Sequence, residues 1–212
     1  PETMEASWLL YAAYILGGYL LGSILFGSIL PKTIKGIDIT VCSRDGNPGT
    51  ANAMQYAGIG VGLLCLLGDL AKGFLPVFLG VRRFGIHPPI FGLVLAAPVV
   101  GHAFSLFRGF RGGKAIAVSF GVLLGLLPRP GIVWILAGLY IFFSLVLRIR
   151  PHERRTVWTF GFFVLFVAVL YLRHNVPLSL LLGSGVMAAI VIYKNLDDRR
   201  LQRHNAAERA AE

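Results

Sequence analysis

The sequence predicts an all-α membrane protein, a polytopic bundle of seven transmembrane helices. Of the 212 residues, 56% are hydrophobic and only 14% are charged, whereas soluble domains carry roughly 25% charged residues. Seven apolar stretches approach the roughly 20 residues with which a helix crosses a bilayer. The formal net charge of +10 gathers in connecting loops, which indicates membrane topology and argues against nucleic-acid binding.

The seven predicted spans follow one another along most of the chain. They cover Trp8–Leu30, Ala57–Val81, Pro89–Phe107, Ala115–Leu127, Gly131–Leu147, Val157–Leu172 and Pro177–Tyr193. The fourth is short, and the polar run from Arg148 to Arg155 separates the fifth from the sixth. We expect a single membrane domain over residues 1–194 and a short charged tail over residues 195–212.

The distribution of Lys and Arg predicts the orientation of the bundle. With the first connecting loop in the cytoplasm, four of the 20 Lys and Arg residues lie on the opposite face and Lys72 lies inside a span, which leaves fifteen on the cytoplasmic face. This excess follows the positive-inside rule. We therefore expect the N-terminus outside and the C-terminus in the cytoplasm.

The stretch from Gly101 to Lys114 is the strongest candidate for a binding loop. It carries three cations, four glycines and three phenylalanines in fourteen residues. Glycines let backbone N–H groups approach an anion, and Arg111 and Lys114 supply compensating charge. A basic turn at the membrane surface, with its glycines used for tight packing, is the alternative.

A second polar loop, Asp45–Asn52, lies on the same predicted face. Asp45 and Asn47 suit tight turns, and Gly49 permits a close backbone approach. Taken alone, this loop is an ordinary turn. We expect it to meet the Arg111–Lys114 segment, with Lys114 Nζ within about 10 Å of the Gly46–Gly49 backbone, a distance that a bound phosphate bridges with modest closure.

Two further patterns lie inside spans and allow either a structural or a functional interpretation. Gly22, Ser23 and Gly27 form a small-residue face that favours close helix packing or presents a hydroxyl to a cavity. Asp69 and Lys72 lie one turn apart in an apolar helix, where such residues pair with each other or line a cavity. No zinc-ligand spacing connects the histidines, so we expect no metal site.

Taken together, these motifs resemble the acyl-phosphate-dependent glycerol-3-phosphate acyltransferases of bacteria. The matching pieces are LLGSILFGSIL, DGNPGTAN, GDLAKGFLPV and GHAFSLFRGFRGGKAIAVSFGVLL, in the family's order and over nearly the whole chain. The resemblance implies transfer of a fatty acyl group from acyl phosphate to the 1-hydroxyl of glycerol 3-phosphate, giving lysophosphatidic acid. It also implies a multi-pass protein of the bacterial inner (plasma) membrane that uses no cofactor and acts as a monomer.

The resemblance also implies site residues. The catalytic candidates are Lys114, Ser23 and Asp198. The candidates for binding substrate and phosphate are Gly46, Asn47, Gly49, Asn52, Arg111, Gly112, Gly113, Arg44, Ser144, Asn195 and Arg199. Lys114 would hold phosphate and stabilise the charge that develops as the acyl carbon becomes tetrahedral.

The chain departs from the family pattern at several of these positions. Ala115 stands where Gly is usual, and Thr40 stands where an Arg is expected. At the C-terminal motif, Asn195 replaces a His and Asp198 replaces an Asn. Losing a proton acceptor costs on the order of 10²–10⁴ in rate, unless Asp197 or Asp198 takes its place. These departures leave open a divergent homologue that binds a lipid phosphate, or uses another acceptor, without the standard reaction. The Asp69/Lys72 pair leaves open a small anion carrier.

Overall fold

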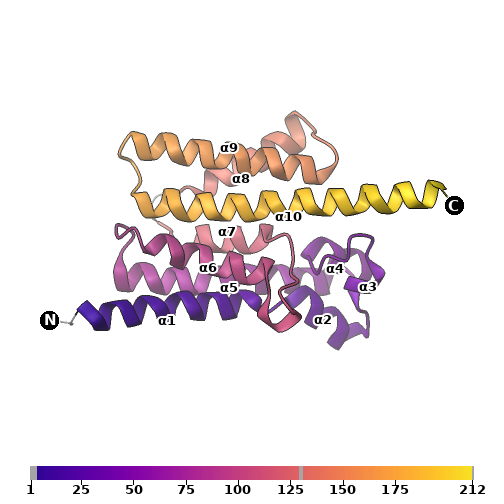
Figure 1. Ribbon diagram of the computed structural model, residues 1–212, viewed down its shortest axis with the longest axis horizontal. Helices are drawn as coiled ribbons and strands as arrows, with labels where there is room; N and C mark the ends of the chain where they lie inside the picture. The colour runs from indigo at the N-terminus through magenta and orange to yellow at the C-terminus, as the bar shows by residue number, and fades with distance from the viewer. Residues whose placement is uncertain (1–3, 129–130, 212) are drawn as a thin grey trace.

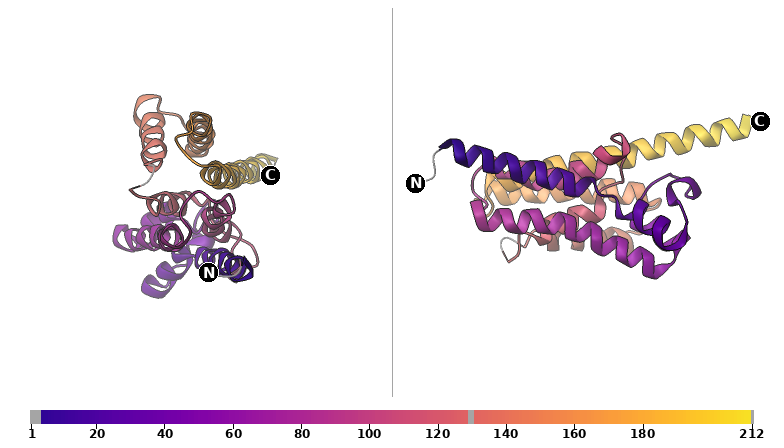
Figure 2. Two further views of the ribbon diagram at one scale, coloured as in Figure 1. Left: turned by 90° about the vertical axis from the view of Figure 1, so that its left-hand side faces the viewer. Right: turned by 90° about the horizontal axis from the view of Figure 1, so that it is seen from below.

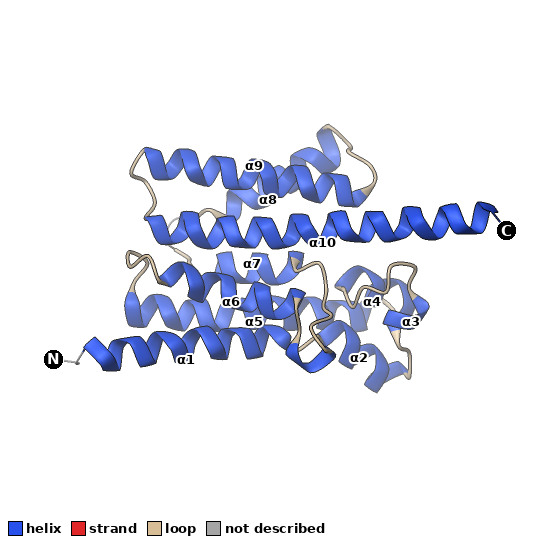
Figure 3. Cartoon of the chain, in the orientation of Figure 1, coloured by secondary structure: helices blue, strands red, loops and turns tan. Residues whose placement is uncertain are grey.

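The computed structural model describes the backbone of residues 4–128 and 131–211, and the side chains of residues 7–128 and 131–197. Within these ranges the chain is helical and forms no strand (Figure 3). The elements are α1 Met4–Ser23, α2 Phe26–Lys35, α3 Ile39–Cys42, α4 Thr50–Ala57, α5 Ile59–Phe84, α6 Phe91–Ala103, the 3-10 turn η1 Leu106–Arg108, α7 Ile116–Leu124, α8 Val133–Ile141, the π-helical turn η2 Phe142–Val146, α9 His152–Leu172 and α10 Leu178–Ala211.

The long helices lie roughly side by side, with α1 beginning at one end of the bundle and α10 ending beyond the other (Figures 1 and 2). Five segments of the described chain are long and apolar enough to cross a membrane, namely Ser7–Lys35, Ile59–Phe84, Phe91–Arg108, His152–Leu172 and Leu178–Asp197. An all-helical membrane protein is therefore confirmed. The stretch Val133–Val146 is shorter than these, and α7 has only nine residues, so the count of seven spans stays a prediction.

The first predicted span, Trp8–Leu30, is divided in the structure. Helix α1 ends at Ser23, and α2 starts at Phe26 after a two-residue break. The carbonyl of Ile24 in this break accepts a hydrogen bond of 2.6 Å from Lys72 Nζ, which compensates for the interrupted helical bonding. Gly27 then packs so closely under the Pro48 carbonyl that a Cβ would overlap it. The break thus carries α2 beneath the Asp45–Asn52 loop.

Helix α6 is the centre of the bundle and is buried along nearly its whole length. It packs against α1, α10 and α5. Small residues permit the close approach on both sides, since a Cβ at Gly22 would overlap the Pro98 carbonyl and one at Gly101 would overlap the Tyr19 carbonyl. Helices in membranes commonly associate through such small residues.

This packing predicts different outcomes for two glycines of α1. Gly22→Ala forces a Cβ onto the Pro98 backbone and should cost roughly 1–3 kcal/mol, as overpacking does. Gly17→Ala is the matched control, because its Cβ would meet nothing within 4 Å. Thermal unfolding in detergent should show a lower midpoint for Gly22→Ala only. Equal midpoints for the two variants would contradict the close α1–α6 contact.

Candidate active site

The two predicted loops meet at the end of the bundle where α10 leaves the other helices (Figure 1). The Gly113 backbone N–H donates to the His102 carbonyl at 3.0 Å. A Cβ at Gly112 would overlap that same carbonyl, and one at Gly113 would lie 3.2 Å from Asn47 Oδ1. The paired glycines are therefore required by the close approach of the loop to α6 and to the Asp45–Asn52 loop.

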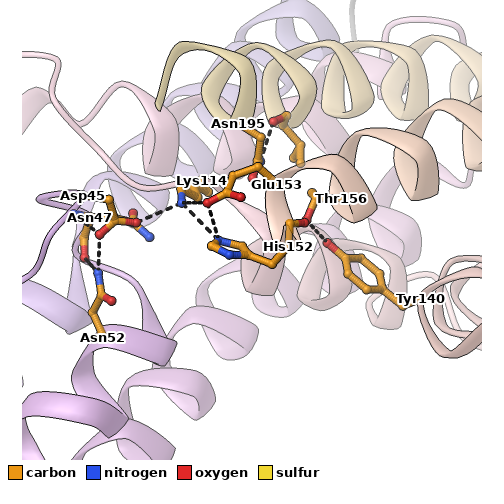
Figure 4. Close-up of polar contacts among 10 residues, drawn as sticks. Asp45, Asn47, Asn52, Lys114, Tyr140, His152, Glu153, Thr156 and Asn195 are labelled. Atoms are coloured by element: carbon orange, nitrogen blue, oxygen red, sulfur yellow. Dashed lines mark hydrogen bonds and ion pairs between the residues drawn. The ribbon is translucent and has the colours of Figure 1, made fainter. Parts of the chain in front are cut away.

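Lys114 joins the two loops (Figure 4). Its side chain is buried, and its Nζ lies 2.9 Å from Asp45 Oδ2. On its other side it faces the first residues of α9, with His152 Nε2 at 3.4 Å and Glu153 Oε1 at 4.0 Å. The cation is thus shared between the Asp45–Asn52 loop and the start of α9.

Asp45 is itself held by its own loop. Its Oδ1 accepts from Asn52 Nδ2 at 2.7 Å and from the Asn47 N–H at 3.2 Å, and Asn52 Nδ2 also donates to the Asn47 carbonyl at 2.9 Å. Because Lys114 and the Asn47 N–H bond to the two oxygens of one carboxylate, Lys114 Nζ lies within the predicted limit of about 10 Å from this backbone. The predicted convergence of the loops is confirmed.

The surroundings of Asp45 determine its protonation. Burial raises the pKa of its carboxyl, but the hydrogen bond and charge of Lys114, with the bonds from Asn52 and Asn47, outweigh burial and hold the pKa below its ordinary value. Asp45 is therefore ionised at neutral pH and forms a charged pair with Lys114.

Two cavities adjoin Lys114. The larger, of about 430 Å³, is mostly apolar and is lined by Asn47, Gly49, Thr50, Ala51, Met54, Leu66, Asp69, His102, Lys114, Ala115, Ile116, Ala117, Phe120, Tyr140 and His152. The smaller, of about 110 Å³, is polar and is lined by Asp45, Gly46, Asn47, Gly112, Gly113, Lys114, Lys194 and Asp197. Lys114 and Asn47 line both, so one ammonium group lies between an apolar space and a polar one.

Several predicted site residues lie away from both cavities. Ser23 is buried, donates to the Tyr19 carbonyl at 2.9 Å and receives the Leu106 N–H at 3.4 Å, so its hydroxyl joins α1 to η1. Arg44 and Arg111 are exposed, and Ser144 lies in the π-helical turn. None of these four lines either cavity, and their predicted roles gain no support from their positions.

The C-terminal candidates lie on α10. Asn195 is fully buried and donates through Nδ2 to the Val191 carbonyl at 2.8 Å, and its Oδ1 has no hydrogen-bond partner among the described residues. Its neighbours Lys194 and Asp197 line the smaller cavity. The side chains of Asp198 and Arg199 lie outside the described residues.

The pair Asp69 and Lys72 has a structural role. Their ion pair measures 2.8 Å, both side chains are almost fully buried, and Lys72 also holds the Ile24 carbonyl. Asp69 and the equally buried His102 reach the wall of the larger cavity. The alternative of an anion carrier, which rested on this pair, therefore loses its support.

Three residues around Lys114 and the larger cavity were not predicted from the sequence, namely His152, Glu153 and Tyr140. His152 and Glu153 begin α9, within the polar run that served only to separate two spans. The available signal was a His-Glu dipeptide just before an apolar run. An acidic residue is favoured in the first turn of a helix, so Glu153 marks the start of the helix and its end of the bundle. Its proximity to Lys114 depends on tertiary packing.

Comparison with known proteins agrees with this geometry. The sequence profile described as "Glycerol-3-phosphate acyltransferase" matches residues 12–203. The glycerol-3-phosphate acyltransferase of Aquifex aeolicus is 33% identical over 195 residues, covering 92% of this chain and 94% of that protein. That of Geobacter sulfurreducens is 34% identical over 175 residues, covering 82% and 84%.

Solved structures give the same result. The crystal structure of PlsY (YgiH), an integral membrane glycerol 3-phosphate acyltransferase, superposes in its glycerol 3-phosphate form with a TM-score of 0.78 and 28% identity, covering 90% of each chain. Its lysophosphatidic acid form gives a TM-score of 0.76 and 27% identity, with the same coverage. The chain belongs to the glycerol-3-phosphate acyltransferase family of integral membrane enzymes.

The backbone at Ala115 yields a stability prediction. Ala115 has φ of +60°, a left-handed conformation that costs an L-residue roughly 1–2 kcal/mol and that glycine adopts freely. Ala115→Gly should therefore be neutral or stabilising in thermal unfolding. Ala117→Gly, two residues on and inside α7, is the matched control and should cost about 1 kcal/mol. The reverse order of the two midpoints would contradict this backbone conformation.

The Asp45–Lys114 pair yields a pH prediction. Because the folded-state pKa of Asp45 is lowered, the unfolded chain binds more protons between the two pKa values, so the pair's contribution is present above pH of about 4 and is lost as the pH falls through the lowered pKa. The unfolding midpoint of Asp45→Asn should be lower than wild type at pH 7. The difference should shrink on acidification to pH of about 3. A pH-independent difference would exclude the charged pair as its cause.

Proposed function

We propose that the chain transfers a fatty acyl group from acyl phosphate to glycerol 3-phosphate, releasing lysophosphatidic acid and phosphate in phospholipid biosynthesis. Family membership gives the acyl transfer. The observation that carries the proposal is Lys114, which separates an apolar cavity from a polar one. An acyl phosphate has the same division, an apolar chain that suits the larger space and an anionic group that suits the smaller.

Lys114 and the glycine loops would hold the donor. The donor phosphate would take the place of the Asp45 carboxylate on Lys114 Nζ, with Gly46, Asn47, Gly112 and Gly113 around it. Backbone N–H groups of such loops favour anions. As the acyl carbon becomes tetrahedral, the same ammonium group stabilises the developing negative charge. The acyl chain would extend along the apolar wall that Phe120 and Tyr140 contribute.

The acceptor would enter at the polar cavity. Lys194 lines it, and its cation is suited to the phosphate of glycerol 3-phosphate, the ligand named for one form of the related PlsY structure. The predicted residues Asp198 and Arg199 follow one turn further along α10 and belong to the proposal as acceptor contacts. No metal or nucleotide has a role in these steps.

The membrane placement completes the proposal. Helix α7 and the Val133–Val146 segment would serve as the two shorter of seven spans, with the loop end of the bundle at the cytoplasmic face of a bacterial inner membrane and the N-terminus outside. The excess of Lys and Arg at that end supports this orientation. Both cavities then face the compartment that supplies soluble glycerol 3-phosphate, and the protein works as a monomer.

Turnover by purified protein tests the proposal. Palmitoyl phosphate and glycerol 3-phosphate should yield lysophosphatidic acid, and Lys114→Ala should lower kcat by about 10²–10³, the usual effect of removing a group that stabilises an oxyanion. Lys35→Ala removes an exposed cation at the end of α2 and should keep wild-type activity. Full activity of Lys114→Ala would refute its proposed role.

The remaining alternative is a homologue that binds phosphate-headed lipids without turnover. Wild-type protein that binds palmitoyl phosphate tightly, but forms no product with glycerol 3-phosphate or another alcohol, would favour it. Product formation by wild type excludes it.

A further inference from the structure

The first turn of α9 places a second set of reactive groups beside Lys114 (Figure 4). We propose that His152, supported by Glu153, is the general base that removes the proton from the attacking hydroxyl of the acceptor. This inference rests on the proposed acyl transfer. His152 would supply the imidazole that the family pattern has at the position of Asn195.

The position of one nitrogen carries the inference. His152 Nε2 lies 3.4 Å from Lys114 Nζ and 3.2 Å from Glu153 Oε1. A neutral Nε2 accepts from the ammonium group, whereas a protonated Nε2 donates to the carboxylate. The imidazole therefore has a hydrogen-bond partner whether it is neutral or protonated. When it gains a proton, it exchanges the Lys114 ammonium group for the Glu153 carboxylate. That is the property a general base needs at a site of fixed charges.

The burial of the two side chains suits a base and its supporting group. The Glu153 side chain is only 5% exposed, and the His152 side chain is 53% exposed. Glu153 is therefore fixed within the protein, at the N-terminal turn of α9, where the helix dipole favours its charge. His152 both reaches the wall of the larger cavity and remains open to the aqueous side, from which a polar acceptor arrives.

Among the described residues that line the larger cavity or contact Lys114, His152 is the accessible base. Lys114 is a cation, the Asp45 carboxylate accepts through Oδ1 from Asn52 and from the Asn47 N–H, and the Tyr140 hydroxyl donates to Thr156 at 3.0 Å. His102, which also lines the larger cavity, is buried. Its Nδ1 faces Asp69 at 3.7 Å, and its Nε2 packs against Gly113. A substrate therefore reaches the His152 ring without displacing protein backbone, whereas reaching the His102 ring would require the backbone at Gly113 to move.

The acyl transfer conserves its proton and its electron pairs at each step. The acceptor hydroxyl oxygen forms a bond to the acyl carbon while its proton moves to His152 Nε2. The tetrahedral intermediate then breaks the bond between the acyl carbon and the bridging oxygen, and phosphate leaves with that electron pair. The imidazolium, stabilised by Glu153, returns its proton to phosphate or water, and the ester is the product. Lys114 stays protonated throughout.

His152→Gln tests the base directly. In detergent-solubilised enzyme with palmitoyl phosphate and glycerol 3-phosphate, it should lower kcat by about 10²–10³, within the range for general-base catalysis, and leave KM for palmitoyl phosphate within about threefold. The acidic limb of the wild-type pH–rate profile, which protonation of the general base produces, should disappear. His87→Gln is the matched control, since His87 is exposed in the loop between α5 and α6, and it should retain both rate and limb.

Two further variants separate catalysis from folding. Added imidazole should restore part of the activity of His152→Ala, which an enzyme inactive through misfolding would not show. Glu153→Gln should keep the acidic limb but lower kcat by about tenfold, because it supports the imidazolium without exchanging the proton. Unchanged kcat and pH profile in His152→Gln, with active wild type, would overturn this inference alone. A wild type that makes no lysophosphatidic acid would overturn the proposed function and this inference with it.

Discussion

The ion pair between Lys114 and Asp45 is the contact on which the site depends. It joins the loop before α7 to the loop before α4, which are 69 residues apart in the sequence. Each partner is held from behind, Lys114 by the close seating of Gly112 and Gly113 on α6 and Asp45 by Asn52 and Asn47. A largely buried charge pair of this kind remains only where both ions are well bonded, so the rigid loops and the pair require one another.

The helical core explains why these loops meet at all. Gly22 and Gly101 bring α1 and α6 together, and the break after Ser23 directs α2 under Pro48. Lys72, one of the few cations inside a span, stabilises this break through the Ile24 carbonyl. A buried charge in an apolar helix thus helps to position a loop at the end of the bundle. The geometry of the site therefore depends on packing inside the bundle.

The sequence predicted much of this arrangement, and its failures have physical causes. Apolar run length identified the membrane class, and glycine-and-charge motifs identified both loops and Lys114. The break inside Trp8–Leu30 was missed because residues 24–26 are apolar and no proline or charge marks the break. The Ile24 carbonyl that accepts from Lys72 is also distant from it in sequence. A site role for Ser23 was implied by the family resemblance, whereas helical spacing left close packing and a cavity-facing hydroxyl both open, because spacing gives a shared face but does not tell what covers it. His152 was missed because its proposed role depends on its contact with Lys114, which is 38 residues away in the sequence and comes near only in the folded chain.

Helix α10 has a practical consequence. It supplies Lys194 and Asp197 to the polar cavity and then continues past the other helices (Figure 2). A fluorescent reporter or an immobilisation tag attached after this helix would lie beyond the end of the bundle that carries the site, whereas α1 begins at the opposite end of the molecule (Figure 1). Fusions intended to leave the enzyme accessible, and surfaces intended to capture it in working order, are therefore best attached ahead of α1.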